Sequence, residues 1–398
     1  MKSAVVVDAV RLASGRGKPG GALSTVHPVT MLGSVLRALL DRTGIDPDLI
    51  EDVIAGCVQQ VGEQSMNVAR QALLTAGFPE SVPGVSIDRQ CGSSQQAVHF
   101  AAQGVMSGAY DVVVAAGVES MSRIPLGTSA LGADPLGPGM GVRYPDGLVN
   151  QGISAELIAA RWALSREELD EFAATSHHRA ASASQSGSFD GEIVDIVVPG
   201  PDGRSNTHRL DETIRATTTA AGLASLAPSF VDQTLVQRFP ELSWSITPGN
   251  SSPLTDGASA VLIMSEERAV QLGLRPRARF VAFSVVGDDP LLMLTGPIPA
   301  TRRVLSRAGM SLHDMDCYEV NEAFASVPLA WVKELGADPD KLNPRGGAIA
   351  LGHALGASGG RLLTTMLGHL EQTGGRFGLQ VMCEGGGLAN ATIIERLD

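Results

Sequence analysis

The chain carries an internal repeat, and this repeat restricts its possible folds more than any other feature. A helical pattern over residues 31–44 leads into a strand-like run at 50–54. The same succession returns over residues 298–309 and 315–320, at an offset of roughly 265 residues. Two copies of one helix-and-strand unit predict a duplicated α/β core.

Short apolar runs at residues 4–7, 112–115 and 280–286 alternate with helical patterns. Such runs are typical of strands that are buried on both faces, with helices covering the sheet on either side. A chain of 398 residues, 44% hydrophobic and 18% charged, can bury a large core and is long enough for two or three domains. We therefore expect an α/β fold of layered mixed sheets with helices.

The stretch between the two repeats differs in composition and predicts an inserted loop domain. Residues 127–147 are rich in Gly and Pro, and a long helix then starts at Ser165, which forms a capping-box pattern with Glu168. We expect this helix, with His177 and His178, to pack on the surface without a chemical role. The predicted domains are residues 1–120 for an N-terminal core, completed by about 250–272, residues 121–249 for the loop domain, and residues 273–398 for a C-terminal core.

Charge and cysteine usage exclude several functional classes. A net charge of −12 argues against a nucleic-acid partner, which needs a basic surface, although a local arginine cluster can still bind an anionic ligand. Cys57, Cys91, Cys317 and Cys383 lack the close spacing of a zinc site, so we expect free thiols and no metal. The apolar run at residues 4–7 is too short for a signal peptide or a membrane span, so we expect a cytoplasmic protein without membrane contact.

Cys91 stands where a strand-like run at residues 85–87 turns into a helical pattern over 97–106. Unpaired N–H groups at a helix start stabilise a thiolate, so we expect the pKa of Cys91 to fall below its ordinary value of about 8.5. The same N–H groups can bind an oxyanion. The alternative is a small buried residue at a crowded turn.

His353 lies inside a glycine-dense loop over residues 343–360 that enters a helix. The loop lacks the Gly-Lys-Ser/Thr ending of a Walker phosphate loop and is not a dinucleotide fingerprint. Its glycines allow the backbone to approach a ligand closely. His353 is either an acid or base that this loop positions, or a histidine of the core.

Two further polar segments follow apolar strands. Asn321 could hold a water and Glu322 could orient a neighbour, or the pair could cap a helix. Cys383 ends the strand-like run at 377–383 and precedes Gly385, at a bend that favours glycine. This segment indicates either thiol chemistry beside an oxyanion site or a buried structural thiol.

Together and in this order, the four segments resemble the active-site loops of the thiolase family. The resemblance extends to the N-terminal strand and to residues 117–122 and 247–252, so it spans nearly the whole chain. It implies the thiolase-like duplicated α/β core, a loop domain that holds a coenzyme A and acyl pocket, and an acyltransferase that uses coenzyme A as co-substrate with no tightly bound cofactor. The matching motifs are Cys-x-Ser at residues 91–93, Asn-Glu-Ala-Phe at 321–324, Gly-His at 352–353 and Cys-x-Gly at 383–385.

By this resemblance, Cys91 attacks the 3-keto carbon of a 3-ketoacyl-CoA, acetyl-CoA leaves as an enolate, and a second coenzyme A takes the acyl group from Cys91. His353 activates Cys91 and then the incoming thiol, and Cys383 exchanges a proton with the enolate, so both are expected to titrate near neutrality. His353 and a water on Asn321 bind the enolate oxygen. The N–H groups of Cys91 and Gly385 bind the tetrahedral oxyanion.

The resemblance also implies the residues that bind coenzyme A and the state of assembly. Ser252 is expected near the pantetheine, Phe230 packs on it, and Arg215 lies near the adenine end, while Phe324 and Gly249 complete the binding residues. Members of the family usually assemble as dimers or tetramers. We expect a homodimer or homotetramer here as well.

Departures from the family pattern bear on the substrate. Ala354 replaces the usual Pro after His353, which leaves the base in place. Residues 150–151 are Asn-Gln where short-chain acetoacetyl-CoA thiolases carry His-Met, which favours degradation of longer or bulkier acyl chains. The long apolar segment at residues 230–247 either reshapes the acyl pocket or packs at the surface. Residues 60–65 and 388–396 resemble actinobacterial thiolases, some of which act on sterol-derived substrates.

Three alternatives stay open from the sequence. A biosynthetic acetoacetyl-CoA thiolase uses the same residues in the reverse direction. A decarboxylating ketoacyl synthase shares the fold but lacks a second cysteine, so Cys383 argues against it. A thiolase-like protein that binds acyl-CoA without turnover is expected to lack Cys91, His353 or Cys383, and all three are present.

Overall fold

The computed structural model describes residues 2–200 and 204–398, and its main feature is a mixed sheet of 11 strands. The strand order along the main path is β11-β12-β13-β10-β1-β9-β5-β3-β4, with β2 beside β9 and β6 beside β1. β7 and β8 form a separate hairpin. The strands are β1 Ala4–Leu12, β2 Gly15–Arg16, β3 Asp52–Gly56, β4 Gly84–Ile87, β5 Val112–Ser120, β6 Ile193–Val194, β7 Ile196–Pro199, β8 Ser205–His208, β9 Thr255–Ser265, β10 Ala278–Gly287, β11 Cys317–Val320, β12 Phe377–Glu384 and β13 Leu388–Arg396.

The sheet consists of two halves with the same strand order and the same strand directions. In the N-terminal half, β1, β9 and β5 are antiparallel neighbours and β3 is parallel to β5. In the C-terminal half, β10, β13 and β12 are antiparallel neighbours and β11 is parallel to β12. β1 and β10 join the halves through the antiparallel pair Val5 and Arg279. The predicted duplicated α/β core is confirmed.

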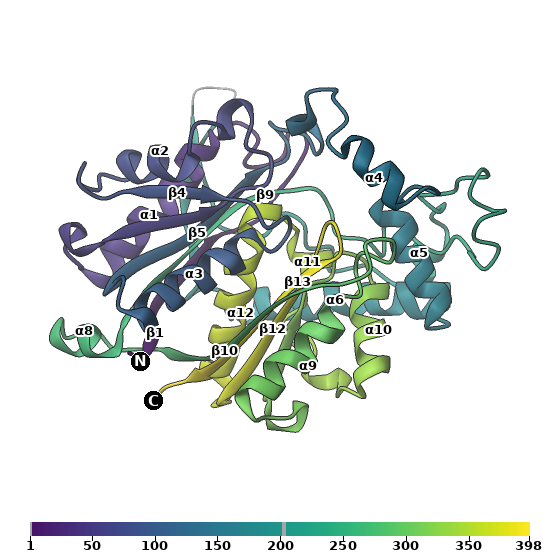
Figure 1. The fold of residues 1–398 in the computed structure, drawn as a ribbon. Coiled ribbons are helices and arrows are strands. Elements are labelled where there is room, and N and C mark those ends of the chain that lie inside the picture. Colours follow the sequence, from purple (N-terminus) through teal and green to yellow (C-terminus); the bar gives the residue numbers. More distant parts are fainter. Residues whose placement is uncertain (1, 201–203) are drawn as a thin grey trace.

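Helices cover both halves and also lie between them (Figure 1). α3 and α12 contact each other, α3 packs on β3, β5 and β9, and α12 packs on strands of both halves. α1 and α2 cover the N-terminal half from outside, and α9 covers β10, β12 and β13. The helices of the two halves are α1 Pro28–Thr43, α2 Val68–Thr75, α3 Ser93–Ser107, α8 Glu266–Gln271, α9 Pro297–Ala308, α10 Ser326–Leu335, α11 Ala348–Leu351 and α12 Ser358–Thr373.

Equivalent residues begin and end the first helix of each half. α1 starts at Pro28 and α9 at Pro297, positions where a missing backbone N–H removes no helical hydrogen bond. α1 stops at Gly44 and α9 at Gly309, with φ values of 65° and 63° that favour glycine. The repeat in the sequence is therefore a repeat of local structure.

Strand burial agrees with the expectation for β1 and β5, which are buried along their whole length. The burial of β10 differs from the expectation, because buried and half-buried residues alternate along this strand. Residues such as Phe280 face the core, while neighbours such as Arg279 reach solvent, because only one face of this strand is fully covered. The expected burial of β10 on both faces is wrong.

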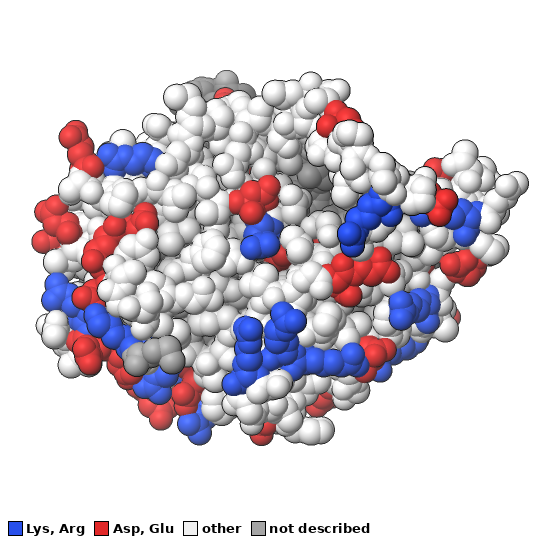
Figure 2. All heavy atoms as spheres, in the orientation of Figure 1, with Lys and Arg blue, Asp and Glu red and all other residues white. Residues whose placement is uncertain are grey.

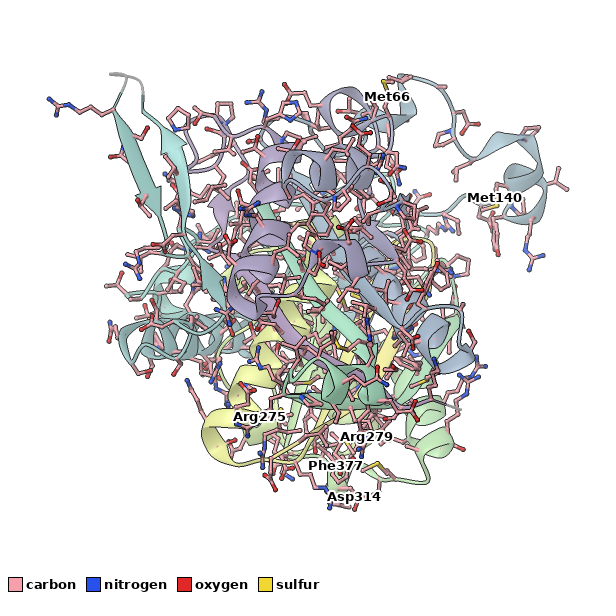
Figure 3. All side chains as sticks on the ribbon, turned by 90° about the vertical axis from the view of Figure 1, so that its left-hand side faces the viewer. Met66, Met140, Arg275, Arg279, Asp314 and Phe377 are labelled. Atoms are coloured by element: carbon pink, nitrogen blue, oxygen red, sulfur yellow. The ribbon has the colours of Figure 1, made fainter. Side chains whose placement is uncertain are left out.

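Most of the chain between β5 and β9 lies outside the sheet, to which β6 returns by pairing with β1. Its long helix α6 starts after Ser165 with the predicted capping box to Glu168, and Gly187, with φ 72°, follows its end. The segment around α4 stands away from the body of the molecule, and Figure 3 shows Met140 there. The helices of this region are α4 Gly137–Arg143, α5 Gln151–Arg161, α6 Arg166–Gln185 and α7 Ala220–Ala224.

Candidate active site

A cavity of about 470 Å³ lies where both halves of the sheet meet the inserted region. Cys91 comes from the start of α3, His353 from the glycine loop before α12, and Ser252 from the segment before β9. Phe230 and Phe324 complete the predicted residues that line it. The fold therefore brings together Cys91 and His353, which are 262 positions apart in the chain.

Cys91 lies in a tight turn between β4 and α3 and is 6% exposed. The hydroxyl of Ser93 accepts from the N–H of Arg89 at 2.8 Å and donates to the carbonyl of Gln90 at 2.6 Å, which closes the turn. Gln90 adopts φ 48° there. Two backbone N–H groups, its own and that of Gly385, contact the sulfur of Cys91. These are the donors that the sequence assigns to an oxyanion.

Burial raises the pKa of Cys91 to about 12, and the nearby carboxyl of Glu384 also raises it, while the two N–H groups act in the opposite direction. The expectation of a lowered pKa is therefore wrong. The helix start supplies the predicted N–H groups, but the cost of ionising a thiol that is shielded from water is larger. Cys91 is a thiol at rest and needs a base.

His353 supplies a base with a defined tautomer. Its Nδ1 lies 2.7 Å from Oγ of Ser358, whose single hydroxyl hydrogen is donated to the carbonyl of Ala354 at 2.8 Å. Ser358 must therefore accept from Nδ1–H, which leaves the lone pair of the neutral ring on Nε2. The backbone N–H of His353 is held by Oγ1 of Thr255 at 2.9 Å.

Burial, helped by the charge of Arg361, lowers the pKa of His353 to about 3. The expectation that His353 titrates near neutrality is wrong for the resting protein, because a buried imidazolium lacks both water and a carboxylate partner. A neutral His353 and a protonated Cys91 are a matched pair of base and acid.

Asn321 follows β11 and faces His353. Its Nδ2 lies 3.3 Å from Nε2 of His353. Its Oδ1 is buried and has no hydrogen-bond partner among the residues that the structure describes. A buried polar atom of this kind usually holds a water. The arrangement fits the predicted role of Asn321.

Glu322 points away from the cavity and holds the loop that carries His353. It accepts from Oγ of Ser176 at 2.7 Å, Nδ2 of Asn343 at 2.8 Å and the N–H of Ile349 at 3.0 Å. The predicted orienting role of Glu322 is therefore visible. The long helix α6 contributes to this anchor through Ser176, and the expectation that the helix has no chemical role stays a prediction.

Cys383 lies near the end of β12 and Gly385 just after it, both beside Cys91. Cys383 is fully buried, and burial together with the adjacent Cys91 raises its pKa well above the ordinary value. It is a thiol at rest, so the expectation of titration near neutrality is wrong for Cys383 too. Gly386 and Gly387 follow with φ 80° and 78°, the bend that the sequence predicted.

Glu119 is a positioning residue that the sequence analysis did not single out. From the end of β5 it accepts from the N–H groups of Val58 at 2.9 Å, Gln59 at 3.1 Å and Gly356 at 2.9 Å. It thereby fastens the loop after His353 to the N-terminal half. The available signal was a lone acid within an otherwise apolar strand, since such a charge is rarely buried without partners.

The predicted binding residues separate into two groups. Phe230 and Phe324 meet edge to face at 6.0 Å, and Gly152 packs so closely on Phe230 that a Cβ would overlap the ring. By contrast, Gly249 and Arg215 do not line this cavity. Gly249 packs against Leu223 and Leu226, and Arg215 lies 3.1 Å from His177.

The long segment at residues 230–247 backs the cavity wall. Phe239 is buried with Ile153 and Leu157, and Trp244 and Phe230 pack against the same cluster. Phe230 is the member of this cluster that reaches the cavity. Residues 230–247 therefore pack together in their own apolar cluster, and through Phe230 they also form part of one wall of the cavity.

The surface and the thiols carry further information on partners. Figure 2 shows acidic and basic side chains interspersed over most of one face, with one group of adjoining Lys and Arg side chains in its lower part. No three His, Cys, Asp or Glu side chains within residues 2–200 and 204–398 are arranged to hold a metal ion. In the same part of the chain, no helix is long and apolar enough to cross a bilayer. All four cysteines are unpaired and buried.

Cys91 and His353 line one cavity. Asn321 contacts His353, and Cys383 lies beside Cys91. On a duplicated α/β core, this arrangement defines a thiol-dependent acyltransferase. The chain belongs to the thiolase family: residues 4–267 match the model of the thiolase N-terminal domain and residues 274–396 that of the thiolase C-terminal domain.

Relatives of known name agree with this assignment. The chain is 49% identical to the steroid 3-ketoacyl-CoA thiolase FadA6 of Mycobacterium tuberculosis, over 100% of this chain and 95% of the relative. It is 44% identical to a 3-ketoacyl-CoA thiolase of Serratia proteamaculans over the full length of both. The crystal structure of the Bacillus anthracis acetyl-CoA acetyltransferase superposes with a TM-score of 0.89 at 38% identity, covering 100% of this chain and 99% of that one.

Proposed function

We propose that this thiolase cleaves 3-ketoacyl-CoA substrates with acyl chains longer or bulkier than acetoacetyl, giving acetyl-CoA and a shortened acyl-CoA. The observation that carries the proposal is the pairing of Cys91 with neutral His353 in a cavity whose far wall is apolar, with Phe230 and Phe324. The two named relatives above are 3-ketoacyl-CoA thiolases, and one is a steroid thiolase. Asn-Gln at residues 150–151 supports the same preference.

In the first half-reaction, Nε2 of His353 accepts the proton of Cys91, and the thiolate attacks the 3-keto carbon. The N–H groups of Cys91 and Gly385 stabilise the oxyanion, each by about 3 kcal/mol. The bond between C2 and C3 then breaks. Protonated His353 and a water on Asn321 stabilise the enolate oxygen, and the thiol of Cys383 gives its proton to C2, which releases acetyl-CoA.

In the second half-reaction, the balance of protons assigns the activation of the incoming thiol to Cys383 and not, as the resemblance implied, to His353. Cys383 is now a thiolate and His353 still carries the proton from Cys91, so Cys383 deprotonates the incoming coenzyme A thiol. That thiol attacks the acyl-Cys91 thioester, and His353 returns its proton to Cys91 as the acyl group leaves. Every group regains its resting protonation state.

The proposal extends to organisation and setting. Residues 1–120 with about 250–272 form the N-terminal core, 121–249 the loop domain that carries the coenzyme A and acyl pocket, and 273–398 the C-terminal core. Support comes from β9, which returns to the N-terminal half of the sheet. Coenzyme A is a co-substrate with no tightly bound cofactor, the protein is a homodimer or homotetramer, and four free thiols fit a cytoplasmic setting.

Thiolysis assays test the function. Purified protein is mixed with free coenzyme A and either acetoacetyl-CoA or a medium-chain 3-ketoacyl-CoA, and the loss of the ketoacyl enolate absorbance is followed. We expect faster turnover of the longer substrate and a loss of at least about a thousandfold in the Cys91→Ser variant. Turnover of acetoacetyl-CoA alone would support the biosynthetic alternative. Acyl-CoA binding without turnover of either substrate, or of a bulky steroid-type one, would support the non-catalytic alternative.

A further inference from the structure

Glu384, the last residue of β12, is a buried acid that the reaction described above does not use. It directly follows Cys383 and is 0% exposed. Both oxygens of its carboxyl group are buried and have no hydrogen-bond partner within residues 2–200 and 204–398. A buried acid usually has several partners, as Glu119 and Glu322 do in this protein, because an unpaired buried charge is costly. The position of Glu384 beside the site therefore indicates a function.

The side chain of Glu384 packs against the turn that carries the nucleophile. Successive side chains of a strand point to opposite faces, so Glu384 shares a face with Met382 and not with Cys383. Met382 packs with Cys91 in one apolar cluster. Glu384 approaches Gly92, the residue after Cys91, so closely that a Cβ on Gly92 would lie 1.8 Å from its Oε1. The carboxyl group therefore lies against the backbone at the start of α3.

Two charged side chains of the same turn act on Glu384 in opposite directions. Arg89 favours its ionisation and Asp88 opposes it, but burial is the larger effect and raises the pKa of Glu384 well above its ordinary value. No hydrogen bond joins Arg89 to Glu384 in the described part of the chain, since Nε of Arg89 and both carboxyl oxygens lack partners. At rest, Glu384 is therefore an uncharged carboxylic acid.

The charge of Glu384 matters because two thiolates form beside it. In the proposed mechanism, Cys91 loses its proton first, and Cys383 loses its own when it protonates C2. Ionised Glu384 raises the pKa of both thiols, and for Cys91 its effect is larger than that of the other nearby carboxylate, Glu119. An uncharged Glu384 leaves both steps unopposed, whereas a carboxylate would oppose each of them.

We propose that Glu384 is a positioning residue that acts as a switch on the nucleophile: the uncharged acid packs against the turn and permits a thiolate on Cys91, and its carboxylate suppresses that thiolate. The proton leaves to water through the turn, where Asp88 and Gln90 are exposed. The inference rests on the proposed function and deepens it, because it adds regulation by pH to the same site. An apolar residue at position 384 could fill the space but could not respond to pH.

Alkylation of Cys91 by iodoacetamide, located by peptide mass spectrometry, measures its thiolate without any substrate. The full chain is compared with Glu384→Gln and Glu384→Met, which both remove the titrating group and keep a side chain of similar size. Glu167→Gln, which removes an exposed acid of α6, is the control. We expect the ratio of the variant's alkylation rate to that of the unmodified chain to rise at least about threefold between about pH 7 and about pH 10 for both Glu384 variants. The same ratio should stay constant for the control.

Infrared spectroscopy detects the protonation of Glu384 directly. An un-ionised carboxylic acid has a carbonyl stretch that a carboxylate lacks, and the difference spectrum between the unmodified chain and Glu384→Gln isolates this one group. We expect the band at neutral pH and its loss over the pH range in which the alkylation ratio rises.

Several results would overturn the switch. A ratio that does not change with pH, as a purely structural role of Glu384 would give, is one of them. An equal rise in Glu167→Gln, or a difference spectrum without the acid band at neutral pH, is another. Because neither measurement uses a substrate, a protein that shows the switch but does not catalyse thiolysis would contradict the proposed function alone.

Discussion

At the scale of single residues, the hydroxyl of Ser358 determines which nitrogen of His353 is the base. Replacing Ser358 by Ala removes the acceptor of Nδ1–H, so the ring can take the other tautomer and turn an N–H toward Cys91. We expect kcat for thiolysis to fall between about tenfold and a thousandfold with little change in KM. Thr364→Ala is the control, because Thr364 also donates to a carbonyl within α12, at 2.7 Å, but does not contact His353. An equal loss in both variants would contradict a role through the tautomer.

Sequence and structure agree on which residues meet but not on their protonation. The short motifs around Cys91, Asn321, His353 and Cys383 predict a shared site because each follows a strand or precedes a helix, and such positions converge at one edge of a sheet. The pKa of a thiol or imidazole depends on how much water the remaining chain excludes. That quantity arises from packing across the two halves, which no single motif encodes.

At the scale of elements, Glu322 joins β11, helix α6 and the loop before α11. Glu322→Ala leaves the donors of Ser176, Asn343 and Ile349 buried without an acceptor, so we expect the free energy of unfolding to fall by at least about 3 kcal/mol. Chemical denaturation measures this, with exposed Glu171 of α6 replaced by Ala as control. Thiolysis should also slow, because the His353 loop loses its anchor. A stability loss no larger than that of Glu171→Ala would refute the anchoring role.

His99 links α3 to β13 and predicts a pH dependence of stability. Its Nε2 lies 2.7 Å from Oγ1 of Thr392, and burial lowers its pKa from 6.5 to about 3. Between these two pH values the unfolded chain binds a proton that the folded chain does not. This residue therefore stabilises the fold fully above pH 6.5 and progressively less as the pH falls toward 3.

Replacing His99 by Gln keeps a polar side chain but removes this titration. We expect the slope of unfolding free energy against pH, below pH 6.5, to flatten by up to about 1.4 kcal/mol per pH unit relative to the unmodified protein. Urea denaturation at several pH values measures the slope. The exposed His313 offers the control substitution His313→Gln. An identical slope in the His99 variant and the unmodified protein would show that His99 does not titrate differently in the two states.

The elements that the sequence predicted best are those whose start and end are marked by Pro and Gly. α1 and α9 both have Pro at their start and Gly after their end, so the duplication can be predicted from the amino-acid sequence alone. β10 was predicted less well, because the apolar run at 280–286 does not reveal that one of its faces lies toward solvent. The contact of α6 with the site through Ser176 was missed because a serine within a helix carries no local sign of a distant partner.

At the scale of the whole molecule, the duplication accounts for the position of the site. Each half of the sheet contributes one central helix, and α3 and α12 pack against each other between the halves. Cys91 lies just before α3 and His353 just before α12. Because the two halves are copies, the starts of the two helices meet, and nucleophile and base arrive in one cavity from opposite halves.

One apolar surface of the molecule, at residues 126–142, is not buried in the monomer. The inserted region at residues 126–142 stands away from the body and leaves large apolar side chains in solvent (Figure 3). Leu131 is 78% and Val142 is 85% exposed, with Leu126 and Leu136 at 58%. Apolar patches of this kind usually mark an interface. We expect a second copy of the chain to cover it in the proposed homodimer or homotetramer.

Sedimentation equilibrium tests this assembly. The unmodified protein should sediment at a multiple of the chain mass of 41.3 kDa. Leu131→Asp combined with Val142→Asp places two charges where apolar contact is expected, so the mass should decrease toward a smaller assembly, because an unpaired charge is costly to bury. Val270→Asp is the control, since Val270 is 70% exposed but lies on α8, outside the segment. A monomer in the unmodified protein would overturn the proposed assembly, and an unchanged mass in the double variant would place the interface elsewhere.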